Sequence, residues 1–246
     1  RHYAENCSWH FLTAASLFGI TDRVTTFTTD NARNVVAGLR RLPYIHIPCA
    51  AHVLQLSLHA ATNAMDLHSI LQKCRKIVGH FKHSAANMSE LGKEQLKQEK
   101  PLLTVVQDVP TRWNSTLDMI ERMLAIKSEL LETLSIQKHT LVLLQECEWK
   151  KLETICTVLG HCKYFTELLG GSKYVSCSIV LPAICHLQRV MEMNDADAVY
   201  VQKFKVAFMR DFNERWKGAA KDWLMIASAL DPRYKLRLKL RLKFIS

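Results

Sequence analysis

One carboxylate stands where a β-rich stretch of this 246-residue chain gives way to a helical pattern. The stretch is VTTFTTDNARNVVAGLR, residues 24–40, and the carboxylate belongs to Asp30. Such an aspartate can cap the following helix by accepting backbone N–H bonds, which is worth about 1 kcal/mol. It can also bind Mg²⁺, but two-metal phosphoryl transfer needs several carboxylates that converge at strand ends. The local sequence favours the cap and leaves the metal site open.

A second candidate is the pair Cys49 and His52, which stand three residues apart in PCAAH and share one face of a helix. A zinc site needs two more ligands, and no second pair in the sequence has comparable spacing. Residues 156–162 hold two cysteines and a histidine in a looser arrangement. We therefore expect a buried cysteine and a hydrogen-bonded histidine here. The 8 cysteines include no CxxC pair and predict reduced, mostly buried thiols of an intracellular protein.

A third candidate is the adjacent pair Arg112 and Trp113 in DVPTRWNSTLDMIERML, residues 108–124. Pro110 breaks the preceding segment, and Asn114 or Ser115 can cap the helix that follows. An Arg–Trp pair at a helix entrance can pack structurally. It can also engage a phosphate through charge and an unstacked base through the aromatic face. Composition leaves both interpretations open.

The fourth candidate follows from charge, since the chain has a net charge of +10 and a pI near 9.3. A basic balance of this size favours polyanionic partners, nucleic acid above all. Six basic residues and no acid lie in RYKLRLKLRLK, residues 233–243, where basic residues and leucines come to alternate. The alternation predicts a strand with one cationic face. This strand is either a frayed terminus or a nucleic-acid contact made by Arg233, Lys235, Arg237 and Lys239.

The elements that must position these residues change in character near residue 50. Before it, the pattern predicts a helix at 4–19, a strand at 24–29, a helix at 31–41 and a strand at 44–48, which together form an α/β unit. After it, almost everything reads as helix, with no repeat and no apolar run long enough for a membrane span. Two apolar stripes and one aromatic row predict the helical core: Leu117, Ile120, Leu124, Leu131 and Leu134; Leu152, Ile155, Leu159, Cys162 and Leu169; Phe204, Phe208, Phe212 and Trp216.

Five motifs in one order make the chain resemble a hAT-family DNA transposase, most of all the vertebrate transposase-derived proteins with BED-type zinc fingers. The motifs are TDNARN (29–34), CAAH followed by VLQLSL (49–58), TRWNS (111–115), CSIVLPAI (177–184) and ALDPRYK (229–235). The resemblance spans nearly the whole chain.

The resemblance implies an α+β, α-rich fold in which a partial ribonuclease H-like core is interrupted by a large helical insertion domain. We expect residues 1–60 to form the partial core, 61–228 the all-helical insertion, and 229–246 the LDPRYK segment and the basic tail. The family also implies that Asp30 holds the position of the second of three acidic metal ligands. His52 and the pair Arg112 and Trp113 match residues near the DNA and the active site, where the tryptophan handles a flipped base.

The departures from the family pattern bear on activity. The first acidic ligand, the third one, the BED finger and the C-terminal dimerisation region find no match in this chain, which starts without methionine and reads as an interior fragment. One carboxylate cannot hold the metal pair, so we expect no enzyme and no cofactor here, although the family implies Mg²⁺.

The sequence thus predicts a non-catalytic, domesticated nuclear protein or fragment that acts in DNA binding or transcription regulation. The alternative is an interior segment of an active transposase, and a third candidate is a scaffold without affinity for DNA. The expected partner is DNA, with a homo-oligomer formed through the missing family regions and no membrane contact.

Overall fold

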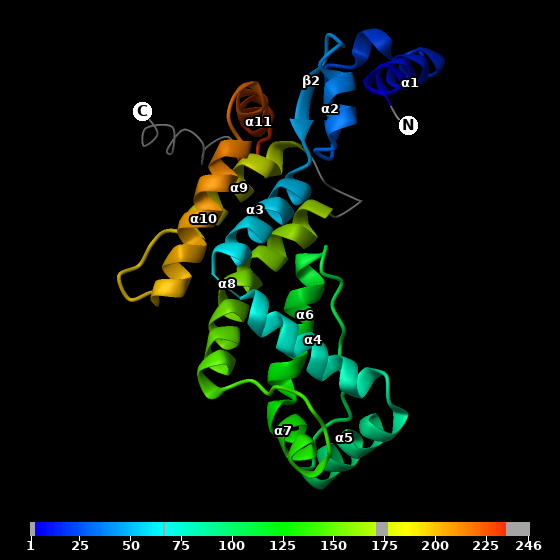
Figure 1. Cartoon of the computed structure of the whole chain (residues 1–246). Helices are drawn as coiled ribbons and strands as arrows, with labels where there is room; N and C mark the ends of the chain where they lie inside the picture. The colour runs from blue at the N-terminus through cyan, green and yellow to red at the C-terminus, as the bar shows by residue number, and fades with distance from the viewer. Residues whose placement is uncertain (1–2, 66, 171–176, 235–246) are drawn as a thin grey trace. The chain divides into compact units, whose positions relative to one another are not determined.

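The computed structural model describes residues 3–65, 67–170 and 177–234 (Figure 1). The chain divides into two compact units, each considered by itself. The strand unit comprises Arg1–Ser57, Phe165–Glu192 and Phe208–Ser246, and the helical unit comprises Leu58–Tyr164 and Met193–Ala207. The fold is mainly helical with a small sheet, as the sequence predicts.

The strand unit begins with a helix and a βαβ arrangement. Its elements are α1 (Ala4–Leu17), the 3₁₀ helix η1 (Thr21–Arg23), β1 (Thr26–Thr29), α2 (Arg33–Leu39) and β2 (Ile45–Pro48). The two strands pair in parallel, with Thr26 opposite Ile45 and Thr29 opposite Pro48. Parallel neighbours need a crossover connection, which α2 supplies. The predicted strand pairing is confirmed, although both strands are shorter than the predicted 24–29 and 44–48.

Helix α1 ends in a backbone conformation that glycine favours. Gly19 has a φ of 62°, its N–H donates to the carbonyl of Ser16, and the N–H of Ile20 donates to the carbonyl of Ala15. These two bonds are the Schellman pattern, in which the residue after the C-cap takes a left-handed conformation. The predicted stop at Gly19 is therefore confirmed and has a physical cause.

Helices α1 and α2 approach so closely that one position has no room for a side chain. A Cβ added to Gly38 would lie 2.8 Å from the Ala4 carbonyl oxygen and 2.9 Å from the Cys7 Cβ. The buried Ser8 Oγ lies 3.0 Å from the Ala4 carbonyl oxygen and 2.8 Å from that of Gly38, and it can donate to either. The contact between the two helices thus depends on the absence of a Cβ at residue 38.

Two later helices, α9 (Cys177–Val190) and α11 (Ala219–Leu230), also belong to the strand unit. Helix α11 packs against α9 and also contacts β2. The Ser228 hydroxyl donates to the Ser178 carbonyl at 2.7 Å, and the Ser178 hydroxyl donates to Asp231 Oδ2 at 2.6 Å. The second bond joins the CSIVLPAI and ALDPRYK motifs, which lie far apart in the sequence, and Ser228 directly precedes the second motif.

Helix α10 (Val199–Arg215) carries the predicted aromatic row. Phe208 and Phe212 stack with ring centroids 5.0 Å apart, and Phe212 meets Trp216 edge-on at 6.4 Å. All three side chains are buried, as is Phe204 in the helical unit. The prediction that this row is core rather than a base-stacking surface is confirmed.

The helical unit contains the later part of α3 (Ala50–Ala64), then α4 (His68–Lys82), α5 (Ala85–Lys97), α6 (Trp113–Ala125), α7 (Lys127–Ile136) and the first part of α8 (Glu146–Gly170). Helix α5 packs against both α4 and α7. An irregular segment, 98–112, leads from α5 to α6. No helix in the described part of the chain is both long enough and apolar enough to cross a bilayer.

The first predicted apolar stripe is partly wrong. Leu117, Ile120 and Leu134 are buried, but Leu124 and Leu131 are only half-buried. Their predicted places in the core are taken by Met123 and Leu130. The reason is that the helix ends at Ala125 and a new one starts at Lys127, so the periodicity does not continue through the break. In the second stripe Leu152, Ile155, Leu159 and Cys162 are buried, and Leu169 is half-buried.

The compact units differ from the predicted domain ranges. The predicted insertion runs without interruption over 61–228, whereas the structure groups 165–192 and 208–228 with the strands. The physical reason is that α11 packs on α9 and reaches β2. The first boundary, between residues 57 and 58, lies close to the predicted one near residue 60.

Candidate nucleic-acid interface

Asp30 lies in the strand unit, directly after the carboxyl end of β1. Its Oδ1 accepts the Ala32 N–H at 3.1 Å, which is the geometry of an Asx turn. Helix α2 starts at Arg33 with Ala32 as N-cap, so the prediction that Asp30 caps a helix from residue 31 is wrong by two residues. Asp30 binds the turn that leads into the helix.

The neighbouring strand residues hold a half-buried histidine beside Asp30. Thr29 Oγ1 lies 3.0 Å from His46 Nε2, across the parallel pair of strands. Burial, reinforced by the Arg40 cation, lowers the pKa of His46 despite its bond to Thr29. At neutral pH this imidazole is therefore uncharged.

The residues around Asp30 do not fit a magnesium pair. In the described ranges, no three or more His, Cys, Asp or Glu side chains lie close enough together to hold a metal ion. A two-metal site needs several converging carboxylates, and Asp30 is one. The assignment of Asp30 as a metal-ligand position stays a prediction, and we derive no metal-dependent step for this chain.

Cys49 and His52 follow β2 in the strand unit. Both side chains are half-buried, and the Cys49 N–H donates to the Thr29 carbonyl at 2.8 Å. All 8 cysteines are free. The expectation that most are buried is wrong, because Cys74 and Cys162 are buried, Cys147 is exposed and the rest are half-buried. Burial raises the pKa of the Cys74 and Cys162 thiols to about 12, which makes them poor nucleophiles.

Arg112 and Trp113 lie in the helical unit, at the end of a tight turn formed by residues 109–112, the Arg112 turn. The Arg112 N–H donates to the Val109 carbonyl at 2.8 Å, with Pro110 at the second position. Helix α6 starts at Trp113 with Arg112 as N-cap and has no side-chain cap. The prediction that Asn114 or Ser115 caps this helix is therefore wrong.

Ser115 instead closes the Arg112 turn from inside the helix. Its Oγ accepts the Val109 N–H at 2.8 Å. The same hydroxyl lies 2.7 Å from the Arg112 carbonyl oxygen and 3.0 Å from that of Val109, and it can donate its single hydrogen to one of them. The start and the end of the turn are thus joined through one side chain.

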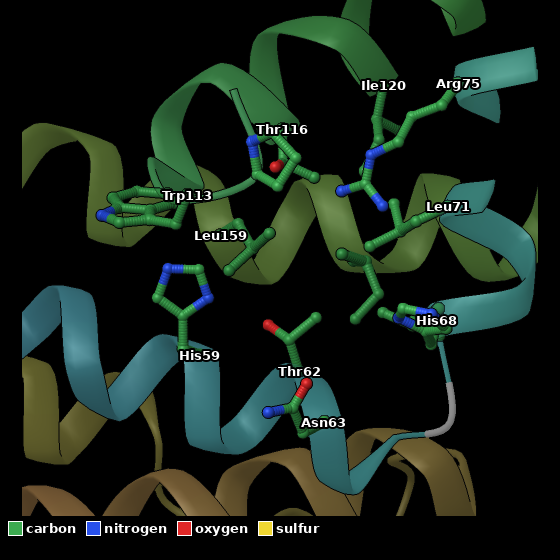
Figure 2. A pocket seen from close by; sticks show the side chains of 13 residues that line it. His59, Thr62, Asn63, His68, Leu71, Arg75, Trp113, Thr116, Ile120 and Leu159 are labelled. Atoms are coloured by element: carbon green, nitrogen blue, oxygen red, sulfur yellow. The ribbon is translucent and has the colours of Figure 1, made fainter. Parts of the chain in front are cut away.

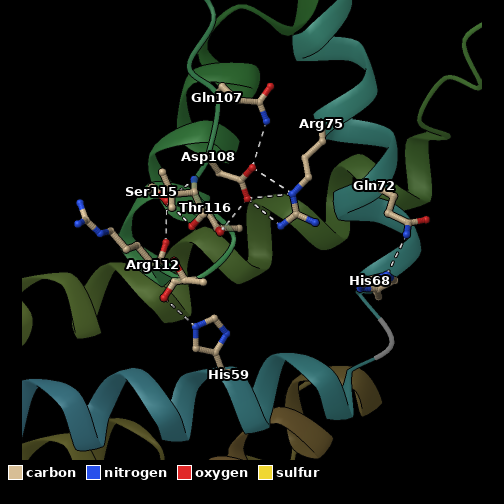
Figure 3. A network of polar contacts seen from close by, with 11 residues as sticks. His59, His68, Gln72, Arg75, Gln107, Asp108, Arg112, Ser115 and Thr116 are labelled. Carbon is tan, nitrogen blue, oxygen red and sulfur yellow. Dashed lines mark hydrogen bonds and ion pairs between the residues drawn. The ribbon is translucent and has the colours of Figure 1, made fainter. Parts of the chain in front are cut away.

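A buried carboxylate anchors the segment that enters the turn (Figure 3). The Asp108 side chain is 0% exposed and accepts bonds from Arg75 Nε at 3.0 Å and Nη2 at 2.7 Å. Thr116 Oγ1 donates to it at 3.0 Å and Gln107 Nε2 at 3.2 Å. Burial alone would raise the pKa of Asp108, but the Arg75 guanidinium and the two neutral donors hold that pKa below its usual value.

A pocket of about 160 Å³ lies under the turn. Figure 2 shows His59, Thr62 and Asn63 on α3 facing Trp113 and Thr116 on α6 across this space. Trp113 lines the pocket but is only 5% exposed, so the structural interpretation of this side chain holds. Stacking of Trp113 on a base stays a prediction.

Arg112 differs from its neighbour because its side chain is exposed. Within the described residues, no hydrogen bond or ion pair engages its guanidinium. The sequence did not point to Asp108, Arg75, Thr116 or His59. Asp108 gave a weak signal as an acid next to an apolar Val-Pro pair, whereas Arg75 lies 33 residues earlier and gave none.

Of the four basic residues predicted to contact DNA at this end of the chain, Arg233 is the one that lies within the described residues. Its Nε lies 3.0 Å from Asp231 Oδ1 and its Nη2 lies 2.7 Å from Oδ2. This pairing neutralises much of the Arg233 charge. The hydrogen bonds that Asp231 accepts from Arg233 and Ser178 lower the pKa of its carboxyl group. Lys235, Arg237 and Lys239, and the predicted strand itself, lie outside the described residues.

Comparison with known proteins finds similarity to a transposase, to a BED-type zinc finger protein and to a transcriptional regulator. Residues 47–158 match the family model of the ZBED1 RNase-like helical domain. The chain is 28% identical over 197 residues to a putative AC transposase of Zea mays, covering 78% of this chain and 24% of that protein. It is 24% identical over 236 residues to human zinc finger BED domain-containing protein 4, covering 94% of this chain and 19% of that protein.

A third relative comes from a fungus. The putative transcriptional regulator tpeD of Talaromyces stipitatus is 27% identical over 195 residues, covering 64% of this chain and 23% of that protein. The chain spans about a quarter or less of the length of these three relatives.

Proposed function

Because the chain is related to hAT transposases and to BED-type zinc finger proteins, we propose that it belongs to a transposase-derived nuclear protein that binds DNA and regulates transcription without catalysing strand transfer. The names of the relatives support the three parts of this proposal separately: transposase, zinc finger protein and transcriptional regulator.

The fold supports a matching assignment of parts. Two parallel strands joined by α2, with an aspartate at the carboxyl end of β1, are what a portion of a ribonuclease H-like core contains. We assign the strand unit to that core and the helical unit to the insertion domain. The family model that matches residues 47–158 is described as RNase-like and helical, which agrees with the second assignment.

The observation that carries DNA binding is the uneven charge of the chain. The strand unit holds 17 Lys and Arg against 9 Asp and Glu, while the helical unit holds 16 against 14. Nearly all of the net charge of +10 therefore belongs to one unit. A concentrated positive charge attracts the phosphates of nucleic acid and releases their counterions on binding.

Binding to a short DNA duplex, measured by fluorescence anisotropy over a series of salt concentrations, tests this proposal. The logarithm of the affinity should fall linearly with the logarithm of salt, with a slope of about −0.9 for each phosphate contacted. Lys93→Gln, an exposed change in the helical unit, is the matched control and should leave the slope unchanged. Absence of binding at low salt overturns the proposal and favours a scaffold.

A second candidate is an interior segment of an active transposase, which the match to the AC transposase and the position of Asp30 favour. The test is metal-dependent nicking of a supercoiled plasmid with Mg²⁺ or Mn²⁺. We expect none, because one carboxylate cannot hold the metal pair. Nicking that disappears in Asp30→Ala would establish the second candidate instead.

A further inference from the structure

Arg112 combines a fixed backbone with a free side chain. Its N–H bonds Val109, and its carbonyl oxygen accepts the Ser115 N–H at 3.1 Å in addition to the Ser115 hydroxyl. Its guanidinium is exposed and unpaired within the described residues. Several half-buried basic side chains of the helical unit differ in this respect; Lys73, Arg75 and Lys163, for example, pair with carboxylates at 2.7–2.8 Å.

An unpaired guanidinium on a fixed turn suits a phosphate. Its planar fork can donate two parallel hydrogen bonds to one phosphate group, which gives geometric selectivity as well as attraction. The value of this contact depends on how much order the site must acquire on binding. A side chain on a preformed turn loses less conformational freedom than one on a mobile loop.

The order of the turn can be traced to Asp108. Asp108 is the residue directly before the Arg112 turn. Its carboxylate accepts hydrogen bonds from Arg75 on α4 and from Thr116 in the first turn of α6. Ser115, next to Thr116, then bonds both Val109 and Arg112. Without the Asp108 charge, the Arg75 guanidinium would lose its partner and the segment would lose its link to both helices.

We propose that Asp108 is a positioning residue that, through Arg75, Thr116 and Ser115, holds the Arg112 turn in the conformation that binds a DNA phosphate. This role rests on the proposed DNA-binding function and adds to it a residue that does not itself contact DNA. Pre-ordering the backbone of the turn is worth roughly twofold to tenfold in affinity.

A double-mutant cycle on the full chain tests the role. Arg112→Ala, Asp108→Asn and the combined variant are compared for binding to a short blunt duplex and to the same duplex with unpaired bases at one end. Arg112→Ala should lower the salt slope by about 1, because one phosphate contact is lost. Asp108→Asn should weaken binding roughly twofold to tenfold, and the double variant should be no weaker than Arg112→Ala alone.

Two further variants separate positioning from general stability. Glu148→Gln breaks the ion pair of Glu148 with Lys73, which lies on α4 as Arg75 does. This variant should leave the affinity for DNA unchanged. Thr116→Val removes one donor to Asp108 with little change of shape, so it gives a weaker form of the same effect should Asp108→Asn fail to fold. Hydrogen exchange at the Val109 and Arg112 amides should quicken in Asp108→Asn and Thr116→Val but not in Glu148→Gln.

The outcomes distinguish the two proposals. In one outcome the wild type binds DNA and Arg112→Ala weakens this binding, while Asp108→Asn and Thr116→Val do not. That result overturns the positioning role alone. Additive losses in the double variant do the same, since they mean that Asp108 acts elsewhere. Absence of DNA binding by the wild type overturns the proposed function and this role together.

Discussion

The strand unit and the helical unit differ in the balance of their charged residues. In the helical unit 7 of the 16 basic side chains form ion pairs, and basic and acidic residues nearly balance. In the strand unit 17 basic residues face 9 acidic ones, and four of the ten basic residues that the structure describes there form ion pairs. The share of paired basic side chains is therefore similar in the two units, and what differs is the positive surplus, most of which lies in the strand unit and can attract an anion.

The largest effects on stability should come from substitutions in the hydrophobic core of each unit. Phe212→Ala removes a buried ring in the strand unit and Phe81→Ala removes one in the helical unit. Each should lower the free energy of unfolding by about 3–5 kcal/mol, because a cavity is left behind. Hydrogen exchange should show that each loss falls chiefly on its own unit. Phe18→Ala is the control, since that ring is 73% exposed; equal loss of protection in both units would break the comparison.

Removing the basic tail should sharpen the contrast in charge. Deletion of residues 235–246 keeps Arg233 with its Asp231 partner and removes five basic side chains, Lys235, Arg237, Lys239, Arg241 and Lys243. If each contacts one phosphate, the salt slope of DNA binding should decrease by about 4.5. A variant with glutamine at those five positions is the matched control for chain length. An unchanged slope would move the DNA contact to other residues of the strand unit.

Acid should weaken the helical unit through Asp108. Because its folded pKa lies below the unfolded value, ionised Asp108 stabilises the fold above that unfolded value, and this contribution is lost as pH falls through the acid range below about 4. Asp108→Asn should therefore cost about 1–3 kcal/mol at neutral pH and less at low pH. Urea unfolding as a function of pH measures this difference. An equal loss of unfolding free energy in Asp108→Asn at neutral and at low pH would contradict the prediction.

One helix end in each unit offers a smaller test. Gly19 and Glu99 both follow a helix in the same Schellman pattern, with φ of 62° and 55°. Only glycine adopts this conformation without steric cost, so Glu99→Gly should stabilise the helical unit by about 1 kcal/mol and Gly19→Ala should destabilise the strand unit by a similar amount. Gln98→Gly, at an ordinary φ of −88°, should destabilise instead. A loss of stability in Glu99→Gly would contradict this prediction.

The smallest expected effect is that of a chelator. In the described part of the chain no His, Cys, Asp and Glu side chains form a metal-holding group, so neither unit should need zinc. Far-ultraviolet circular dichroism should show the same helical content before and after treatment with EDTA. A drop in helical signal that zinc restores would contradict this.

The sequence predicted what depends on local pattern. The β-branched run before Asp30, Gly19 and the 44–48 segment correctly indicated two neighbouring strands with a helix between them, because strand propensity and turn chemistry act between near neighbours. The start of α2 was missed by two residues, since an Asx turn and an N-cap use the same residue types. Both could be separated only by backbone geometry.

The sequence could not predict what depends on distant partners. The bond between Asp108 and Arg75 joins residues 33 positions apart, and periodicity identifies a buried face but not the side chain opposite it. For the same reason Arg112 and Trp113 looked alike as candidate DNA contacts, whereas one is exposed and the other is buried. The pairing of Arg233 with Asp231 likewise removed charge that a count of basic residues had included.

The close approach of α1 and α2 at Gly38 also bears on how this gene can drift. Every single-base change that replaces this glycine adds a Cβ, which would lie 2.8 Å from the Ala4 carbonyl oxygen. The contact cannot accommodate the new atom without a shift of one backbone against the other. Among related sequences, those still selected for a folded product should therefore keep the glycine codon, while those released from selection should lose it as readily as any other.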